Sequence, residues 1–179
     1  RDLQGVHFAM DFLTQQNRLI SGQIEEIPEG YQAKGKKVLV IGGGDTGADC
    51  VGTSNRQGAE SVTQIELMDQ LPAMRSADNP WPEWPMTLTT STSHEEGAER
   101  DWSILTKRFI GEEGKLTGVE TVKIQWTDKA KFQYEEIPGT EEIIDCDMAF
   151  LAIGFSNPEH SLPNQFGLEL DPRGNLKTL

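Results

Sequence analysis

The sequence has little cysteine and no long apolar run, and each scarcity excludes a class of protein. Cys50 and Cys146 lie far apart and form no CxxC pair, which excludes a disulfide framework and a cysteine-based zinc or iron–sulfur site. We expect both to be buried small hydrophobic residues, a usage that suits a reducing cytoplasm. No apolar run approaches the roughly 20 residues of a membrane span, and no signal peptide is visible. We therefore expect a cytoplasmic chain without a membrane partner.

Positive charge is also scarce. The chain carries 16 Lys and Arg against 29 Asp and Glu, a formal net charge of −13. A negative field of this size argues against nucleic acid as a partner and against anionic membrane surfaces. It does not exclude a phosphate ligand, because backbone amides bind phosphate without side-chain charge.

Recognisable acid–base groups are missing as well. The three histidines, His7, His94 and His160, stand in no catalytic pattern, and the HEE run at His94 is typical of a solvated polar turn. A dehydrogenase acting on an alcohol normally needs a general acid or base. Hydride transfer between a nicotinamide and a flavin depends mainly on positioning. We assign no catalytic residue and no metal ligand.

The chain of 179 residues fits one ordinary domain, or one domain with pieces of a second. It begins at Arg1 rather than Met and ends at Leu179, so we expect it to be a piece of a longer protein. Its hydrophobic fraction of 36% is low for a self-contained enzyme.

Hydrophobic periodicity predicts one strand–turn–helix–strand unit near the start. Residues 37–41 form a short apolar run that enters glycines, as a buried parallel strand does. Residues 45–57 read as a helix that stops at Gly58, and residues 61–68 as a second strand. Upstream, residues 7–20 have helical spacing and end at Ser21 and Gly22.

The rest of the chain alternates irregular and strand-like segments. Four prolines between residues 69 and 86 exclude regular structure there, although Trp81 and Trp84 predict an ordered loop packed on this domain or on another. Residues 87–101 carry no clear pattern. Strand patterns at 102–110, 118–127 and 131–137 predict a three-stranded antiparallel meander, and residues 147–153 another buried strand.

The glycine motif at the first turn carries the chemistry. Gly42, Gly44 and Gly47 form G-x-G-x-x-G between a predicted strand and a predicted helix, the context that a dinucleotide fingerprint requires. The first glycine permits the tight turn, the second admits the pyrophosphate, and the third lets the helix pack closely on the strand. Gly43 completes the expected phosphate site. The alternative is a glycine-rich turn without a ligand.

Several neighbours are expected to contact the same ligand. Glu66, followed by Leu67, lies near the end of the second strand, where an acidic residue accepts hydrogen bonds from the adenosine ribose and favours NADH. It could also be a solvated carboxylate. Arg75 would favour NADPH if it reached a 2′-phosphate. Asp45 and Thr46 either shape the phosphate loop or simply cap the helix.

Five stretches of sequence carry a family resemblance. They are GGGDTGADCVGTSNRQGA (42–59), DNPWPEWP (78–85), SHEEGAERDW (93–102), LTKRFIG (105–111) and DMAFLAIGFSNPE (147–159). Together with the opening segment from Arg1, they resemble the small (β) subunit of glutamate synthase and the matching part of its single-chain NADH-dependent forms. DNPWPEWP is more diagnostic than the glycine motif, which many flavoproteins share.

The resemblance implies a domain arrangement. The parent would be a flavoprotein with two dinucleotide folds, whose NAD(P)H-binding domain is inserted in an FAD-binding domain. Residues 1–29 would be a flank of the FAD domain, 30–150 the NAD(P)H domain, and 151–179 the return segment. Ala152, Ile153 and Gly154 would lie beside the nicotinamide. The expected fold is α/β, with a Rossmann-like parallel sheet and the antiparallel meander.

The resemblance also implies an activity and partners. Hydride would pass from NAD(P)H to FAD, and electrons would then pass through iron–sulfur clusters to a large subunit that forms glutamate from glutamine and 2-oxoglutarate. The FAD fingerprint and the cysteine-rich region of the family are absent from this sequence, so FAD and clusters are expected only in the parent. Glu66 resembles the NADH enzymes, whereas other bacterial members have paired arginines there and use NADPH. Two alternatives stay open: a non-catalytic Rossmann redox-sensing module and a free-standing dehydrogenase.

Overall fold

A parallel sheet forms the centre of the molecule in a computed structural model that describes residues 2–155 and 157–178. Three residues named in the expectations lie outside the described residues: Arg1 of the opening segment, Ser156 of the last quoted stretch and Leu179 at the end of the expected return segment. The sheet runs in the order β1 (Val6–Phe8), β9 (Met148–Leu151), β2 (Lys37–Ile41), β3 (Ser61–Glu66) and β4 (Glu99–Trp102), with every neighbouring pair parallel.

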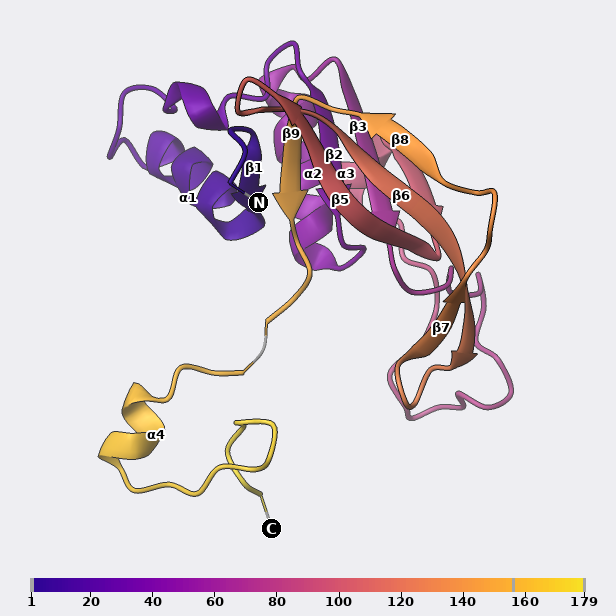
Figure 1. The fold of residues 1–179 in the computed structure, drawn as a ribbon. Helices are drawn as coiled ribbons and strands as arrows, with labels where there is room; N and C mark the ends of the chain where they lie inside the picture. Colours follow the sequence, from indigo (N-terminus) through magenta and orange to yellow (C-terminus); the bar gives the residue numbers. More distant parts are fainter. Residues whose placement is uncertain (1, 156, 179) are drawn as a thin grey trace.

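Helices cover one face of this sheet (Figure 1). They are α1 (Ala9–Ile20), α2 (Asp45–Gln57) and the short α3 (Thr92–Glu95); a 3-10 turn, η1, spans Glu29–Tyr31, and α4 (Ser161–Gln165) follows the sheet. Val38 and Val40 of β2 belong to the core cluster on the helix side. Leu39 belongs to the cluster on the opposite side, with Ile41 packed against it. The apolar run in β2 is therefore explained by burial on both faces of the strand.

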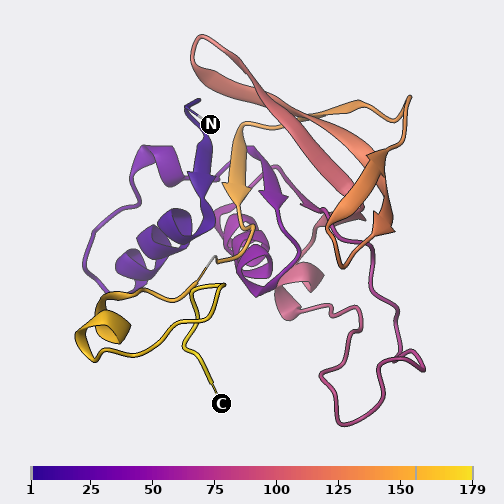
Figure 2. The same cartoon turned by 60° about the horizontal axis from the view of Figure 1, so that its bottom comes forward.

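An antiparallel sheet covers the other face, so the molecule has three layers (Figure 2). Its strands are β5 (Ile104–Glu112), β6 (Lys115–Asp128), β7 (Gln133–Glu136) and β8 (Glu142–Asp145). Both β7 and β8 pair with β6. The third strand predicted over 131–137 is thus present as β7, whereas β8 is a fourth strand that was not predicted. Pro138 lies between β7 and β8, where a residue without an N–H cannot continue the ladder.

The N-terminal segment pairs with the central sheet. β1 pairs with β9, and Phe12 of α1 stacks on Phe150 with ring centroids 4.0 Å apart. Both rings are fully buried. The first 20 residues and β9 therefore share one core, although they stand at opposite ends of the sequence. The helix predicted over 7–20 begins at Ala9, because the residues before it form β1.

The loop between β3 and α3 has no helix or strand over residues 69–86, as the prolines predict. It is ordered by polar contacts around Asn79, whose side chain receives a hydrogen bond from the Met86 N–H and donates one to the Trp84 carbonyl. Trp81 and Trp84 are each 83% exposed. The expectation that they pack on this domain is wrong; packing against another domain stays a prediction.

Within residues 2–155 and 157–178, no helix has the length and apolar character to cross a membrane. The same residues contain no group of three or more His, Cys, Asp or Glu side chains placed to hold a metal ion.

Candidate functional site

The glycine turn lies at the carboxyl edge of the parallel sheet, between the end of β2 and the start of α2. Gly42 has a φ of +125°, and a Cβ there would lie 2.2 Å from the Ala152 carbonyl oxygen. The Gly42 N–H donates to the Ile65 carbonyl at 2.8 Å. The turn is therefore pressed between β3 and the segment after β9, and only glycine fits its first position.

The other two motif glycines differ in their surroundings. A Cβ on Gly47 would lie 2.2 Å from the Gly42 carbonyl oxygen, so this glycine lets α2 approach the turn closely. A Cβ on Gly44 would meet no heavy atom within 4 Å. Gly44 therefore borders open space, as a residue against which a ligand lies must do.

The first turn of α2 has no side-chain cap. Gly44 is the N-cap residue and makes no side-chain hydrogen bond, and Asp45 is the first helical residue. The interpretation of Asp45 or Thr46 as an ordinary N-cap is therefore wrong. The unpaired amides of this turn, with the positive end of the helix dipole, form a site suited to an anion.

Glu66 closes the turn from β3. Its carboxylate accepts a short hydrogen bond from the Gly43 N–H and another from the Met68 N–H at 3.0 Å. Its place at the last residue of β3 fixes the carboxylate over the turn. This position matches that of the ribose-binding carboxylate in dinucleotide folds.

Two cavities open on either side of the turn, and both are lined by Gly44 and Glu66. The first, of about 490 Å³, has a largely apolar wall that includes Leu67, Ile104, Ala152, Ile153 and Gly154. The second, of about 520 Å³, is lined by Gly43, Asp45, Trp84, Arg100, Trp102 and Lys129 among others. Each lies within the size range of small-ligand sites.

The structure does not bring Arg75 to this site. The Arg75 guanidinium donates to the Asn79 carbonyl at 3.1 Å and to the Glu83 carbonyl at 2.9 Å, and Arg75 lines neither cavity. Its charge holds the proline-rich loop together instead.

Arg100 and Lys129 are the cations that the second cavity does contain, and the sequence reading missed both. The Arg100 guanidinium lies 5.1 Å from the centroid of the Trp102 ring, and burial lowers the pKa of Arg100. Lys129 pairs with Asp69 at 2.7 Å. Arg100 is brought here by the register of β4 on β3, where it stands beside Gln64. No local motif marks that register.

The two cysteines are free and buried, as predicted. Cys50 lies in the core on the helix side and Cys146 in the core on the other side of the sheet. Burial raises the pKa of each thiol to about 12. The thiols are therefore protonated at neutral pH and take no part in thiolate chemistry.

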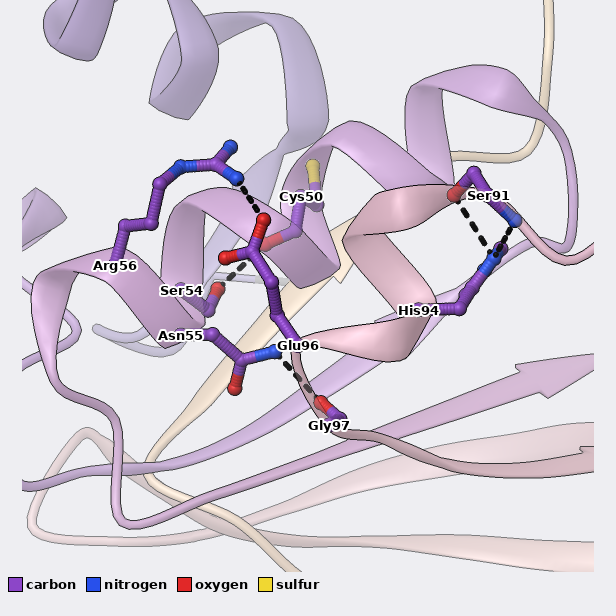
Figure 3. Close-up of polar contacts among 8 residues, drawn as sticks. All are labelled: Cys50, Ser54, Asn55, Arg56, Ser91, His94, Glu96 and Gly97. Atoms are coloured by element: carbon purple, nitrogen blue, oxygen red, sulfur yellow. Dashed lines mark hydrogen bonds and ion pairs between the residues drawn. The ribbon is translucent and has the colours of Figure 1, made fainter.

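His94 does not lie in a solvated turn, which corrects the interpretation of the HEE run. Its Nε2 lies 2.9 Å from the Gln64 side-chain oxygen, and its Nδ1 faces Ser91 (Figure 3). The same segment is tied to α2 by the Arg56–Glu96 ion pair and by a hydrogen bond of 2.6 Å from Asn55 to the Gly97 carbonyl.

Two solved structures share this fold. The thioredoxin reductase of T. acidophilum superimposes with a TM-score of 0.58 at 21% identity, over 97% of this chain and 43% of that one. An FAD-dependent pyridine nucleotide-disulphide oxidoreductase from Desulfovibrio vulgaris gives 0.53 at 24% identity, over 97% and 36%. These likenesses show the fold, a Rossmann-type α/β domain.

The model of the pyridine nucleotide-disulphide oxidoreductase family matches residues 2–178, and the chain belongs to that family. Among curated proteins, it is 41% identical to the NADH glutamate synthase of Saccharomyces cerevisiae over 100% of this chain and 9% of that protein. It is 39% identical to the NADPH glutamate synthase small chain of Mycobacterium tuberculosis and 40% identical to that of Bacillus subtilis. The chain spans 36% of each of these small chains. The resemblance that the motifs carry is confirmed.

Proposed function

We propose that this chain binds a nicotinamide dinucleotide across the glycine turn and presents it for hydride transfer to a flavin. The observation that carries the proposal is the uncapped start of α2, with Gly44 facing open space. This point is also where the sheet order reverses, since β3 lies on one side of β2 and β9 on the other. Ligands of open α/β sheets bind at such a switch point.

The two cavities support one direction for the bound ligand. Glu66, at the end of β3, would accept hydrogen bonds from the ribose hydroxyls. The adenosine would therefore occupy the cavity lined by Arg100 and Trp102. The nicotinamide would then enter the more apolar cavity bordered by Ala152, Ile153 and Gly154. The pyrophosphate would lie between them on the amides of the first turn of α2.

The role of the protein in the reaction is positioning. Hydride transfer moves a proton and two electrons together from the nicotinamide ring, and FAD in an adjoining domain would accept them. The chain supplies an anion site, a ribose acceptor and an apolar pocket that excludes water from the ring. It has a single G-x-G-x-x-G fingerprint, so we place the FAD site outside this sequence.

The coenzyme is proposed to be NADH. A carboxylate at Glu66 stabilises free ribose hydroxyls and repels a 2′-phosphate. At an effective dielectric of about 20, two charges a few ångströms apart repel by a few kcal/mol before screening. Arg100 and Lys129 oppose this preference from the far wall. Glu66 favours NADH because its carboxylate is fixed on the turn itself, whereas Lys129 is already paired with Asp69.

We further propose that the parent is a glutamate synthase, whose FAD domain and large subunit are the partners of this chain. Identities of 39–41% to glutamate synthases of both coenzyme types support this assignment. The flanks, residues 1–29 and 151–179, would belong to the FAD domain, and residues 30–150 would form the NAD(P)H-binding domain, on whose sheet β1 packs. Two unpaired cysteines fit a reducing compartment such as the cytoplasm.

Calorimetric titration with NADH, combined with an NADH oxidation assay using ferricyanide as acceptor, tests the proposal. The chain should bind NADH and should not oxidise it, because the flavin site is absent. Rapid oxidation by the flavin-free chain would contradict the proposal, and oxidation of NADH with a small carbonyl substrate would identify a free-standing dehydrogenase instead. An absence of any binding would remove the proposed function.

A further inference from the structure

A line of hydrogen bonds runs beneath the glycine turn from α3. The Gln64 side chain, 2% exposed in β3, donates from Nε2 to the Gly42 carbonyl at 2.9 Å. Its oxygen Oε1 lies 2.9 Å from His94 Nε2. On the far side of the ring, Ser91 lies within hydrogen-bond distance of His94 Nδ1, with N at 3.2 Å and Oγ at 3.0 Å (Figure 3).

The chemistry of the groups fixes the direction of every bond in this line. The Ser91 backbone N–H can only donate, so His94 Nδ1 must accept. His94 is then neutral with its hydrogen on Nε2, which donates to Gln64 Oε1. That bond leaves the Gln64 amide nitrogen facing the Gly42 carbonyl. Burial, and secondarily the Arg100 guanidinium, lower the pKa of His94 and favour the same neutral form.

The line ends on one peptide unit of the phosphate turn. The carbonyl of Gly42 and the N–H of Gly43 are the two ends of the same planar peptide group. Gln64 holds the carbonyl end and Glu66 the N–H end. Both side chains come from β3, two residues apart and therefore on the same face of the strand. This peptide leads directly into Gly44, which borders the open site.

Other contacts hold α3 on α2, so the hydrogen bonds of His94 and Gln64 are not needed for that attachment. The segment around α3 is held to α2 by the Asn55 bond to Gly97 and by the Arg56–Glu96 pair. Those contacts lie at the outer end of the α2–α3 interface (Figure 3). Only the His94 contact reaches inward to Gln64 and, through it, to the turn.

We propose that His94 and Gln64 are positioning residues for pyrophosphate binding, which they support by fixing the Gly42–Gly43 peptide. The proposal rests on the proposed function, because it assigns these residues to the same nucleotide site. Neither residue touches the ligand. They act through the orientation of the turn, as outer hydrogen-bond partners orient the ligands of other binding sites.

Affinity measurements on matched variants test the proposal. His94→Phe keeps a ring but removes both hydrogen bonds, and Gln64→Leu removes the bond to Gly42. Each should raise the Kd for NADH and for ADP-ribose by about tenfold, the lower end of such outer-contact effects. The double variant should be no weaker than either single variant, because both break the same line. His94→Gln, which keeps an amide donor, should restore affinity to within about threefold of the original.

Asn55→Ala is the control, since it loosens α3 without touching the line. It should leave both Kd values unchanged. Unchanged affinity in His94→Phe and Gln64→Leu, equal losses in Asn55→Ala, or failure of His94→Gln to rescue would each overturn the proposal.

A second measurement separates this proposal from the proposed function. Nitrogen NMR of the free chain should show His94 neutral with its hydrogen on Nε2, and His94→Phe should shift the Gly43 amide resonance. The opposite tautomer, or an unmoved Gly43 resonance, overturns the positioning role. If the unmodified chain bound neither NADH nor ADP-ribose, the proposed function and the positioning role would both fail, whereas intact binding with unaffected variants removes the positioning role alone.

Discussion

The glycines of the turn separate binding from folding, and two substitutions exploit the difference. A Cβ on Gly44 meets nothing within 4 Å, whereas a Cβ on Gly47 would lie 2.2 Å from the Gly42 oxygen and 2.8 Å from Gln64 Nε2. Gly44→Val therefore adds methyl groups to open space, and Gly47→Ala adds one to a packed contact. We expect the first to weaken cofactor binding strongly and the second to destabilise the fold.

The sizes of the two effects follow from these surroundings. In Gly44→Val, methyl groups occupy the approach of the pyrophosphate and remove at least one or two hydrogen bonds to a charged ligand, each about 1.5–3 kcal/mol. Each 1.4 kcal/mol is about tenfold in Kd, so affinity should fall by roughly a hundredfold. Loss of glycine at the N-cap should cost no more than about 1 kcal/mol of stability. Gly47→Ala should cost about 1–3 kcal/mol by overpacking, which lowers Tm by about 2–4 °C per kcal/mol.

Thermal unfolding followed by circular dichroism, with calorimetric titration of NADH, measures both effects on the same samples. A Gly44→Val chain that is folded and binds NADH with unchanged affinity would show that the turn is not the phosphate site. A Gly47→Ala chain with an unchanged Tm would refute the close approach of α2 to Gly42.

Three further predictions concern one carboxylate, the two thiols and two indoles. Glu66→Ala should lower the ratio of NADH to NADPH affinity, measured as a pair of Kd values; a chain that prefers NADPH before substitution would contradict the assignment of Glu66. Cys50 and Cys146 should resist a disulfide reagent at pH 8 in the folded chain and react once it is unfolded in guanidinium, because burial raises both thiol pKa values to about 12; rapid reaction of the native chain would place one thiol at the surface. Trp81 and Trp84, each 83% exposed, should account for most of the acrylamide-quenchable fluorescence, so Trp81→Phe combined with Trp84→Phe should leave emission that acrylamide quenches less, from the partly buried Trp102 and Trp126; little change in quenching would show that both indoles are covered.

The glycine turn could be predicted from the sequence because its determinants are local. A strand, a tight turn and a helix N-terminus follow one another within 21 residues of chain, from Lys37 to Gln57. Each motif glycine has a steric reason that any such turn imposes. The cysteines could likewise be predicted as buried, since without CxxC spacing they had no other assignment.

The parts that were missed depend on pairing between distant segments. β1 has three residues, too few to show a period, and it is defined only by its register with β9. The contact of His94 with Gln64 joins residues 30 positions apart, so His94 is directed inward although Glu95 and Glu96, which follow it, are exposed. Arg75 and Arg100 are both arginines near the site in sequence, but only the register of β4 on β3 brings one of them to the cavity.

The loop over residues 69–86 shows a different limit of prediction from sequence. Its prolines correctly exclude regular structure. The two indoles, which were expected to order the loop by packing, are exposed. Asn79, 8% exposed, organises the loop through hydrogen bonds to main-chain groups at Trp84 and Met86. A single amide with four hydrogen-bonding positions leaves no periodic mark in a sequence.

A crystal structure of the chain with NADH tests the central claim most directly. The pyrophosphate oxygens should accept hydrogen bonds from the backbone amides of the first turn of α2, at about 2.7–3.2 Å. The adenosine should lie on the Arg100 side of Glu66 and the nicotinamide beside Ala152. A dinucleotide found elsewhere, for example in the cavity of about 520 Å³ between α1 and α2, would contradict the account.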